Sequence, residues 1–171
     1  MTEHDESEHV KEVYARFGLA VYYAQVLEHG LVNALLILDL VPSRPRIARS
    51  SEEWGAAVDK FTGRHFETTM GQMMKNLRDV TQVGADLESM LRDALQKRNS
   101  LVHDYFRERA TKFMSSVGRE QMLREVDEWR DLFDTADQHL EKVVAPLRTE
   151  AGITDEMVER EFQRNVNEAQ T

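Results

Sequence analysis

Eight consecutive residues hold the side chains of this chain that are most able to do chemistry. The stretch is Arg98-Asn99-Ser100-Leu101-Val102-His103-Asp104-Tyr105. Over little more than two turns of a predicted helix it supplies a fixed cation, an amide, an imidazole and a phenol. His103 is notable because imidazole alone has an unperturbed pKa close to neutrality.

Arg98 occupies a position where the helical pattern predicts an apolar residue. Apolar residues that recur with helical spacing form a seam along one face of this segment: Leu87, Leu91, Ala94, Leu101 and Tyr105. Arg98 fills the one gap in that seam. A buried guanidinium costs several kcal/mol unless it is paired or hydrated. The position therefore predicts a specific role or a specific partner for Arg98.

The chemical groups of this segment spread over a wide arc of an ideal helix. Asn99 and His103 share one face, whereas Arg98 and Tyr105 share another, and Arg98 and His103 are about 140° apart. Arg98 and His103 therefore need not meet within one chain. They can converge if two such helices face each other across a two-fold axis, where each surface meets its own copy.

The segment resembles the signature of the HEPN superfamily, in which an arginine precedes a histidine by a short spacing within a helical bundle. Arg98 is followed by the polar Asn99, four residues separate Arg98 from His103, and Tyr105 completes Arg-x4-His-x-Tyr. That form is found in the toxins of HEPN/MNT toxin–antitoxin pairs. Residues 41–83 and 150–171 have no counterpart in the resemblance.

The resemblance implies a metal-independent endoribonuclease of the cytoplasm that acts as a homodimer on RNA. His103 would serve as general base or acid, and Arg98 would stabilise the charge that develops on phosphorus. Asn99 would orient His103 or the phosphate. Tyr105 would hold Arg98 or accept adenylylation from a nucleotidyltransferase-type antitoxin. HEPN-like proteins without nuclease activity also exist, so a helical dimerisation or partner-binding module is the alternative.

Other polar groups are candidates for supporting roles. In the first long helical segment, Gln25 and Glu28 lie on a mostly apolar stripe, and Glu28 is the expected counter-charge for Arg98 or His103. The loop expected at 42–49 carries three arginines that are candidates for contact with phosphate: Arg44, Arg46 and Arg49. The alternative is that both groups are ordinary solvated polar residues.

Composition restricts the class of protein. The 171 residues are 41% hydrophobic and 31% charged, which is typical of one globular domain of 1–171. A net charge of −9 is unusual for a general nucleic-acid binder, so any RNA site must be locally basic. The absence of cysteine excludes thiol chemistry and cysteine-ligated zinc. We expect no metal and no cofactor. We also expect no membrane partner, because the longest apolar run has only about 11 residues, which is too short to span a bilayer.

The hydrophobic periodicity predicts an all-α, mainly antiparallel helical bundle with short additional helices. Long helices are expected at about 8–40, 85–110 and 117–147, with shorter ones at about 51–61 and 70–80. Pro42 and Pro45 are expected to end the first helix. Residues 1–7 are expected to be a frayed acidic lead, and 150–171 a peripheral tail with a helix capped by Thr154.

Overall fold

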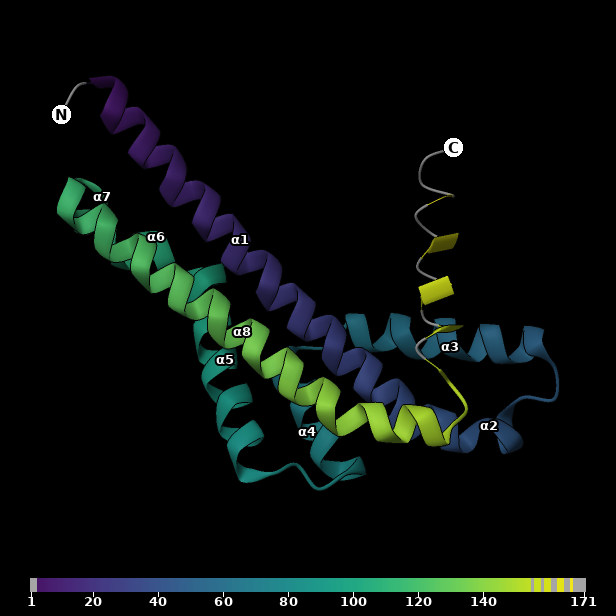
Figure 1. The fold of residues 1–171 in the computed structure, drawn as a ribbon. Coiled ribbons are helices and arrows are strands. Elements are labelled where there is room, and N and C mark those ends of the chain that lie inside the picture. The colour runs from purple at the N-terminus through teal and green to yellow at the C-terminus, as the bar shows by residue number, and fades with distance from the viewer. Residues whose placement is uncertain (1–2, 155, 158, 161–162, 165–166, 168–171) are drawn as a thin grey trace.

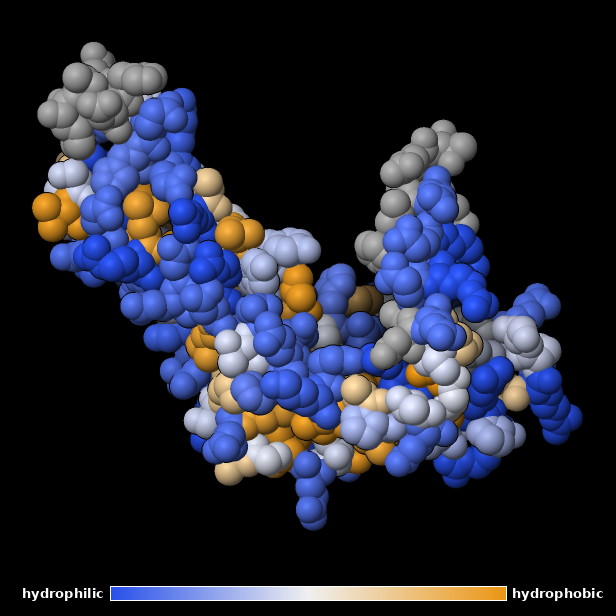
Figure 2. Space-filling view, in the orientation of Figure 1, coloured by the Kyte–Doolittle hydropathy of each residue, from blue (hydrophilic) through white to orange (hydrophobic). Residues whose placement is uncertain are grey.

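The computed structural model describes residues 3–154, 156–157, 159–160, 163–164 and 167. Its described residues contain no β-strand, so the all-α prediction is confirmed. Figure 1 shows two long helices side by side, with shorter helices packed around their lower half. The space-filling view shows a mainly hydrophilic surface with scattered hydrophobic areas (Figure 2).

The first helical segment is longer at both ends than the sequence predicts. Helix α1 (Glu3–Leu35) continues through a π-helix, η1 (Leu36–Leu40), into α2 (Val41–Ile47). The expected lead at 1–7 is thus helical from residue 3, and Glu6 pairs with Arg119 at 3.3 Å.

The prediction that proline ends this helix is wrong. Val41 closes the wide π turn by donating its N–H to the Leu36 carbonyl. Pro42 then stands at the start of α2, where a missing N–H is tolerated, and Pro45 lies inside α2. The expected loop at 42–49 is therefore mostly helix.

Two shorter helices follow, and both begin at the capping residues that the sequence indicates. Helix α3 (Ser51–Phe66) starts after Ser50, whose hydroxyl accepts a hydrogen bond from the Glu53 N–H at 3.1 Å. It runs beyond the expected end at 61. Helix α4 (Met70–Val80) starts after Thr69, whose hydroxyl accepts from the Gln72 N–H.

The helix expected at 85–110 is three helices. Helix α5 (Ala85–His103) ends because Asp104 leaves the helical conformation, with φ −133° and ψ −12°. Helices α6 (Tyr105–Glu108) and α7 (Ala110–Phe113) each form about one turn. Ser115 then caps the last long helix, α8 (Ser116–Glu150), by accepting from the Gly118 N–H at 3.1 Å.

Helices α1, α5 and α8 enclose the core. Contacts of Arg16 with Asp127 and of Glu6 with Arg119 show that α1 and α8 run parallel, as Figure 1 also shows. Helix α5 runs antiparallel to both, because Arg98 reaches Glu28 while the following Tyr105 reaches Phe17. The core residues with no exposed surface are Val13, Ala20, Leu27, Leu31, Val32, Ala94, Met122, Val126, Phe133 and Ala136.

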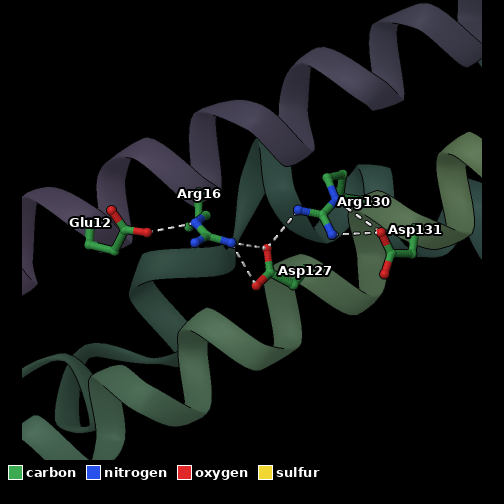
Figure 3. Close-up of polar contacts among 5 residues, drawn as sticks. All are labelled: Glu12, Arg16, Asp127, Arg130 and Asp131. Carbon is green, nitrogen blue, oxygen red and sulfur yellow. Dashed lines mark hydrogen bonds and ion pairs between the residues drawn. The ribbon is translucent and has the colours of Figure 1, made fainter.

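A chain of ion pairs joins the exposed edges of α1 and α8 (Figure 3). Glu12 accepts from Arg16 Nε at 2.6 Å, and Arg16 Nη1 is 3.1 Å from both oxygens of Asp127. Arg130 donates to the same Asp127 at 3.1 Å and to Asp131. Because these groups are exposed to solvent, each pair adds little to stability, and their main effect is to fix the register of the two helices.

A second network holds the segment that follows Asp104 against α8. Arg109 donates to both carboxylate oxygens of Glu125, with Nη2 2.8 Å from Oε1. Its guanidinium carbon is 4.4 Å from the ring centre of Tyr105 and 5.1 Å from that of Trp129. Burial by itself raises the pKa of Glu125, but the hydrogen bonds and positive charge of Arg109 outweigh it, so the pKa is below its ordinary value.

We expect Glu125→Gln to lower the free energy of unfolding at pH 7 by about 2 kcal/mol, because it leaves Arg109 without its charged partner. Since the folded-state pKa of Glu125 is lowered, its contribution is present above the ordinary value of 4.5 and is lost as pH falls through the lowered pKa. Urea unfolding of both proteins between pH 7 and 3 measures this. The stability difference should shrink below pH 4.5, whereas Asp131→Asn should change stability by less than about 0.5 kcal/mol. An undiminished difference at pH 3 would contradict the assignment.

The C-terminal segment leaves the end of α8 and rises beside it (Figure 1). Thr154 caps it as expected, because its hydroxyl accepts from the Met157 N–H at 3.3 Å. The tail helix expected after Thr154 falls partly on residues outside those described.

The helical stretch Glu6–Arg46 is long and apolar enough to cross a membrane. Core helices of soluble proteins commonly have the same length and composition.

Candidate functional site

Arg98 lies at the junction of α5 and α1, where it is paired. Its Nε donates to Glu28 Oε1 at 2.6 Å, and the side chains of Arg98 and Glu28 are 29% and 20% exposed. The ion pair thus offsets the free-energy cost of burying the Arg98 guanidinium in an apolar seam. It is also the contact expected of Glu28 as a counter-charge. One edge of the guanidinium still faces solvent, so it can bind an anion.

Asn99 and His103 lie on the exposed side of α5. Asn99 Oδ1 accepts from Arg98 Nη1 at 3.3 Å, so the amide touches the guanidinium rather than the imidazole. His103 is exposed in the last turn of α5 and has no hydrogen-bond or ion-pair partner within the described part of the chain. An exposed imidazole without a protein partner is free to exchange a proton with a bound molecule.

Tyr105 is separated from this surface. It is 2% exposed, and its hydroxyl donates to the Met122 carbonyl at 3.2 Å. Burial, together with the negative charge of Glu125, raises the pKa of the Tyr105 hydroxyl. The burial of Tyr105 agrees with its place in the apolar seam, but its hydroxyl bonds to Met122 and not to Arg98, and α5 ends at His103 before it.

The three arginines of the expected phosphate-binding loop lie far from Arg98 within the subunit. All three are exposed on or just after α2, at the opposite end of the molecule from the last turn of α5 (Figure 1). Arg44 is occupied by Trp54, with its guanidinium carbon 5.1 Å from the ring centre, and Arg46 donates to Ser43. The backbone N–H of Arg49 donates to Glu53. The structure therefore brings together Arg98, Asn99 and Glu28, but not Arg44, Arg46 or Arg49.

A small hollow of about 60 Å³ adjoins the Arg98–Glu28 pair. Gln25, which the sequence places on the same stripe as Glu28, lines it together with Val102. Val102 is 52% exposed beside Arg98, so the surface next to the pair is partly apolar. Tyr14, also 52% exposed, lies further toward the start of α1, beside Phe106.

We expect Arg98→Met to lower the free energy of unfolding by about 1–2 kcal/mol, because it leaves the mostly buried Glu28 carboxylate unpaired. The double variant Arg98→Met with Glu28→Leu should recover most of this loss, because two apolar side chains replace two charges. Chemical denaturation of the four proteins of the cycle measures the coupling. A coupling close to zero would show that the pair does not hold α5 to α1.

The sequence pattern missed Asp137. This residue follows Phe133 by four positions and precedes Leu140 by three, so it too interrupts an apolar seam. Its carboxylate lines a groove of about 1130 Å³ between α1, η1, α8 and the C-terminal segment. Asp137 therefore carries the same sequence signal as Arg98, a charged residue at a seam position.

No group of three or more metal-ligating side chains occurs among the residues that the structure describes. Comparison with protein-family models, curated proteins and solved structures finds no match to this chain. Function is therefore argued from the geometry and from the motif.

Proposed function

We propose that this protein is a metal-independent endoribonuclease of HEPN type, with a composite site at a homodimer interface. One observation carries the proposal: Arg98 is held at the surface by Glu28, next to an exposed Asn99 and an exposed, unpartnered His103 in the described structure. These are the groups that RNA cleavage without a metal requires, and none of the three is sealed in the core.

The chemistry uses the 2′-hydroxyl of RNA as the nucleophile. His103 removes its proton, the oxygen attacks the adjacent phosphorus, and the bond to the 5′-oxygen breaks. That leaving oxygen takes a proton from a second acid, which leaves a cyclic phosphate on one fragment. Arg98 donates hydrogen bonds to the phosphate oxygens as negative charge develops on them. A second His103 from the partner subunit would supply the acid.

The partner subunit is needed because Arg98 and His103 point in different directions from one helix. Five residues of helix separate them by about 140° around the axis. A two-fold axis near α5 would place Arg98 of each subunit opposite His103 of the other. The exposed Val102 between them, and the exposed Tyr14 nearby on α1, would then be covered.

A second candidate is a non-catalytic dimerisation or partner-binding module. It is favoured by the Glu28 contact, since a carboxylate 2.6 Å from Arg98 Nε neutralises the cation that would bind phosphate. The net charge of −9 also opposes RNA. The two candidates share the dimer surface and differ in whether that surface cuts RNA.

The deciding experiment is RNA cleavage by purified protein in the presence of EDTA, using Arg98→Ala, His103→Ala and their mixture. Each variant alone should be inactive. Mixed and allowed to exchange subunits, they should regain part of the activity, because one of the two sites then holds an intact Arg98 and an intact His103 as base, and water protonates the leaving oxygen in place of the missing second His103. A folded wild type that leaves RNA uncut would support the module, and activity that the mixture does not restore would exclude a shared site.

The proposal extends to the protein's setting and partners. The enzyme would act on RNA in the cytoplasm, and the toxin form of the motif suggests a nucleotidyltransferase-type antitoxin. Arg44, Arg46 and Arg49 would contact RNA that extends beyond the site. Alanine replacements there should weaken RNA binding and its salt dependence without affecting the bond-breaking step.

A further inference from the structure

The groove that contains Asp137 lies between α1, η1, α8 and the C-terminal segment. Its volume of about 1130 Å³ is close to the upper range of ligand pockets in proteins. Apolar side chains from α1, η1, α8 and the C-terminal segment form its walls: Val26, Leu36, Ile37, Leu140, Val144, Ile153 and Met157. In Figure 2 the surface is hollowed between the rising arm of α1 and the C-terminal segment, and the groove lies where these elements meet α8.

Asp137 is the carboxylate of this groove that lacks a counter-charge. Its neighbour in the groove, Glu141, is paired with Arg148. Two other partly buried carboxylates of the bundle, Glu28 and Glu125, are paired with arginine. Asp137 is half-buried, yet it has no ion pair or hydrogen bond in the parts of the chain that the structure describes. Burial, with the negative charges of Glu141 and Asp134, raises its pKa.

The Asp137 carboxylate fits in the groove only because a glycine, Gly30, lies beneath it on α1. A Cβ atom at Gly30 would lie 2.1 Å from Asp137 Oδ1, so the carboxylate rests directly on the backbone of α1. Glycine inside a helix costs about 1 kcal/mol relative to alanine. The bundle thus keeps an unpaired charge at the groove and a glycine beneath it, where an apolar residue and an alanine would be more stable.

We infer that this groove binds a small organic cation, a protonated amine attached to an apolar body, with the ammonium group on Asp137. The ammonium would supply the missing counter-charge, and the apolar body would cover the groove walls. Tyr22, 58% exposed at the groove, offers an aromatic face that also attracts a cation. This inference is independent of the ribonuclease proposal, since Arg98, Asn99 and His103 do not line the groove.

The test is calorimetric titration of the full chain with n-octylammonium, n-octanol and octanoate. We expect saturable binding of the ammonium, at least tenfold tighter than binding of the alcohol, and none of octanoate. Asp137→Asn should weaken ammonium binding at least tenfold, because the substitution keeps the shape and removes the charge. Asp131→Asn, a charge loss on the same helix outside the groove, should leave the affinity unchanged.

A second variant covers the case in which Asp137→Asn disturbs folding. Asn33→Trp places a large side chain at the exposed edge of the groove and should weaken binding by a similar factor. The inference is overturned if the alcohol binds as tightly as the amine, if Asp137→Asn binds like wild type, or if no binding occurs with a Kd below about 1 mM. It is also overturned if Ile37→Asp converts a wild-type dimer to monomer, because a second copy would then occupy the groove.

Discussion

Replacing His103 with alanine is expected to lower the rate of RNA cleavage by about a thousandfold while leaving the fold intact. A positioned general acid or base contributes roughly 10²–10⁴-fold, and a two-fold symmetric site would lose both its base and its acid at once. Stability should change by less than about 0.5 kcal/mol, because His103 is exposed and has no hydrogen-bond or ion-pair partner in the described structure. Single-turnover cleavage in EDTA, with unfolding curves for both proteins, measures the two quantities.

The matched control is His139→Ala on α8. His139 lies near the surface of the molecule, and its Nδ1 is 3.0 Å from the Thr135 carbonyl, so its loss removes an imidazole without touching α5. Cleavage by this variant should equal that of wild type. If the two histidine variants cleave RNA at the same rate, His103 has no part in the reaction.

Replacing Gly118 with alanine is expected to lower the free energy of unfolding by about 3 kcal/mol. A Cβ atom there would lie 2.1 Å from the Lys112 carbonyl oxygen and 2.6 Å from two further backbone atoms of that residue. Backbone cannot move aside as a flexible side chain can, so α7 must separate from α8. That movement also disturbs Arg119, whose buried guanidinium donates to the Phe113 carbonyl at 2.9 Å.

Gly18→Ala on α1 is expected to raise the free energy of unfolding, opposite to the effect of Gly118→Ala. Nothing lies within 4 Å of a Cβ built at Gly18, so alanine should add about 0.5–1 kcal/mol by favouring helix. Urea denaturation of both variants beside wild type measures the difference. Similar stability for the two variants would show that α7 does not press on Gly118.

The sequence predicted the helices well where local chemistry decides their limits. Ser50 and Thr69 cap α3 and α4 as their hydroxyls indicate. It failed where the limit depends on the tertiary environment. Pro42 and Pro45 do not end the helical segment, because Pro42 falls at the start of α2, where a missing N–H is tolerated, and α2 continues through Pro45.

For the candidate site, hydrophobic periodicity predicted which polar residues stand out and one of the contacts between them. Arg98 stands out as a cation in a seam, and Glu28 on the neighbouring stripe is the carboxylate it reaches. Periodicity alone cannot show that a helix breaks between two polar residues such as His103 and Asp104. Tyr105 is buried as its seam position indicates, but its hydroxyl reaches Met122 and not Arg98, and the Arg109–Glu125 pair was not foreseen.

The burial of Tyr105 has a kinetic consequence for any enzyme that would modify it. Its oxygen is bonded to the Met122 carbonyl beneath the ring, so a transferase could reach it only in molecules whose 105–113 segment has swung away from α8. Each additional 1.4 kcal/mol or so of opening free energy makes such molecules about tenfold rarer. The rate of modification at the Tyr105 hydroxyl would thus depend on how often the 105–113 segment opens locally. A ligand that stabilises the closed bundle would lower that rate.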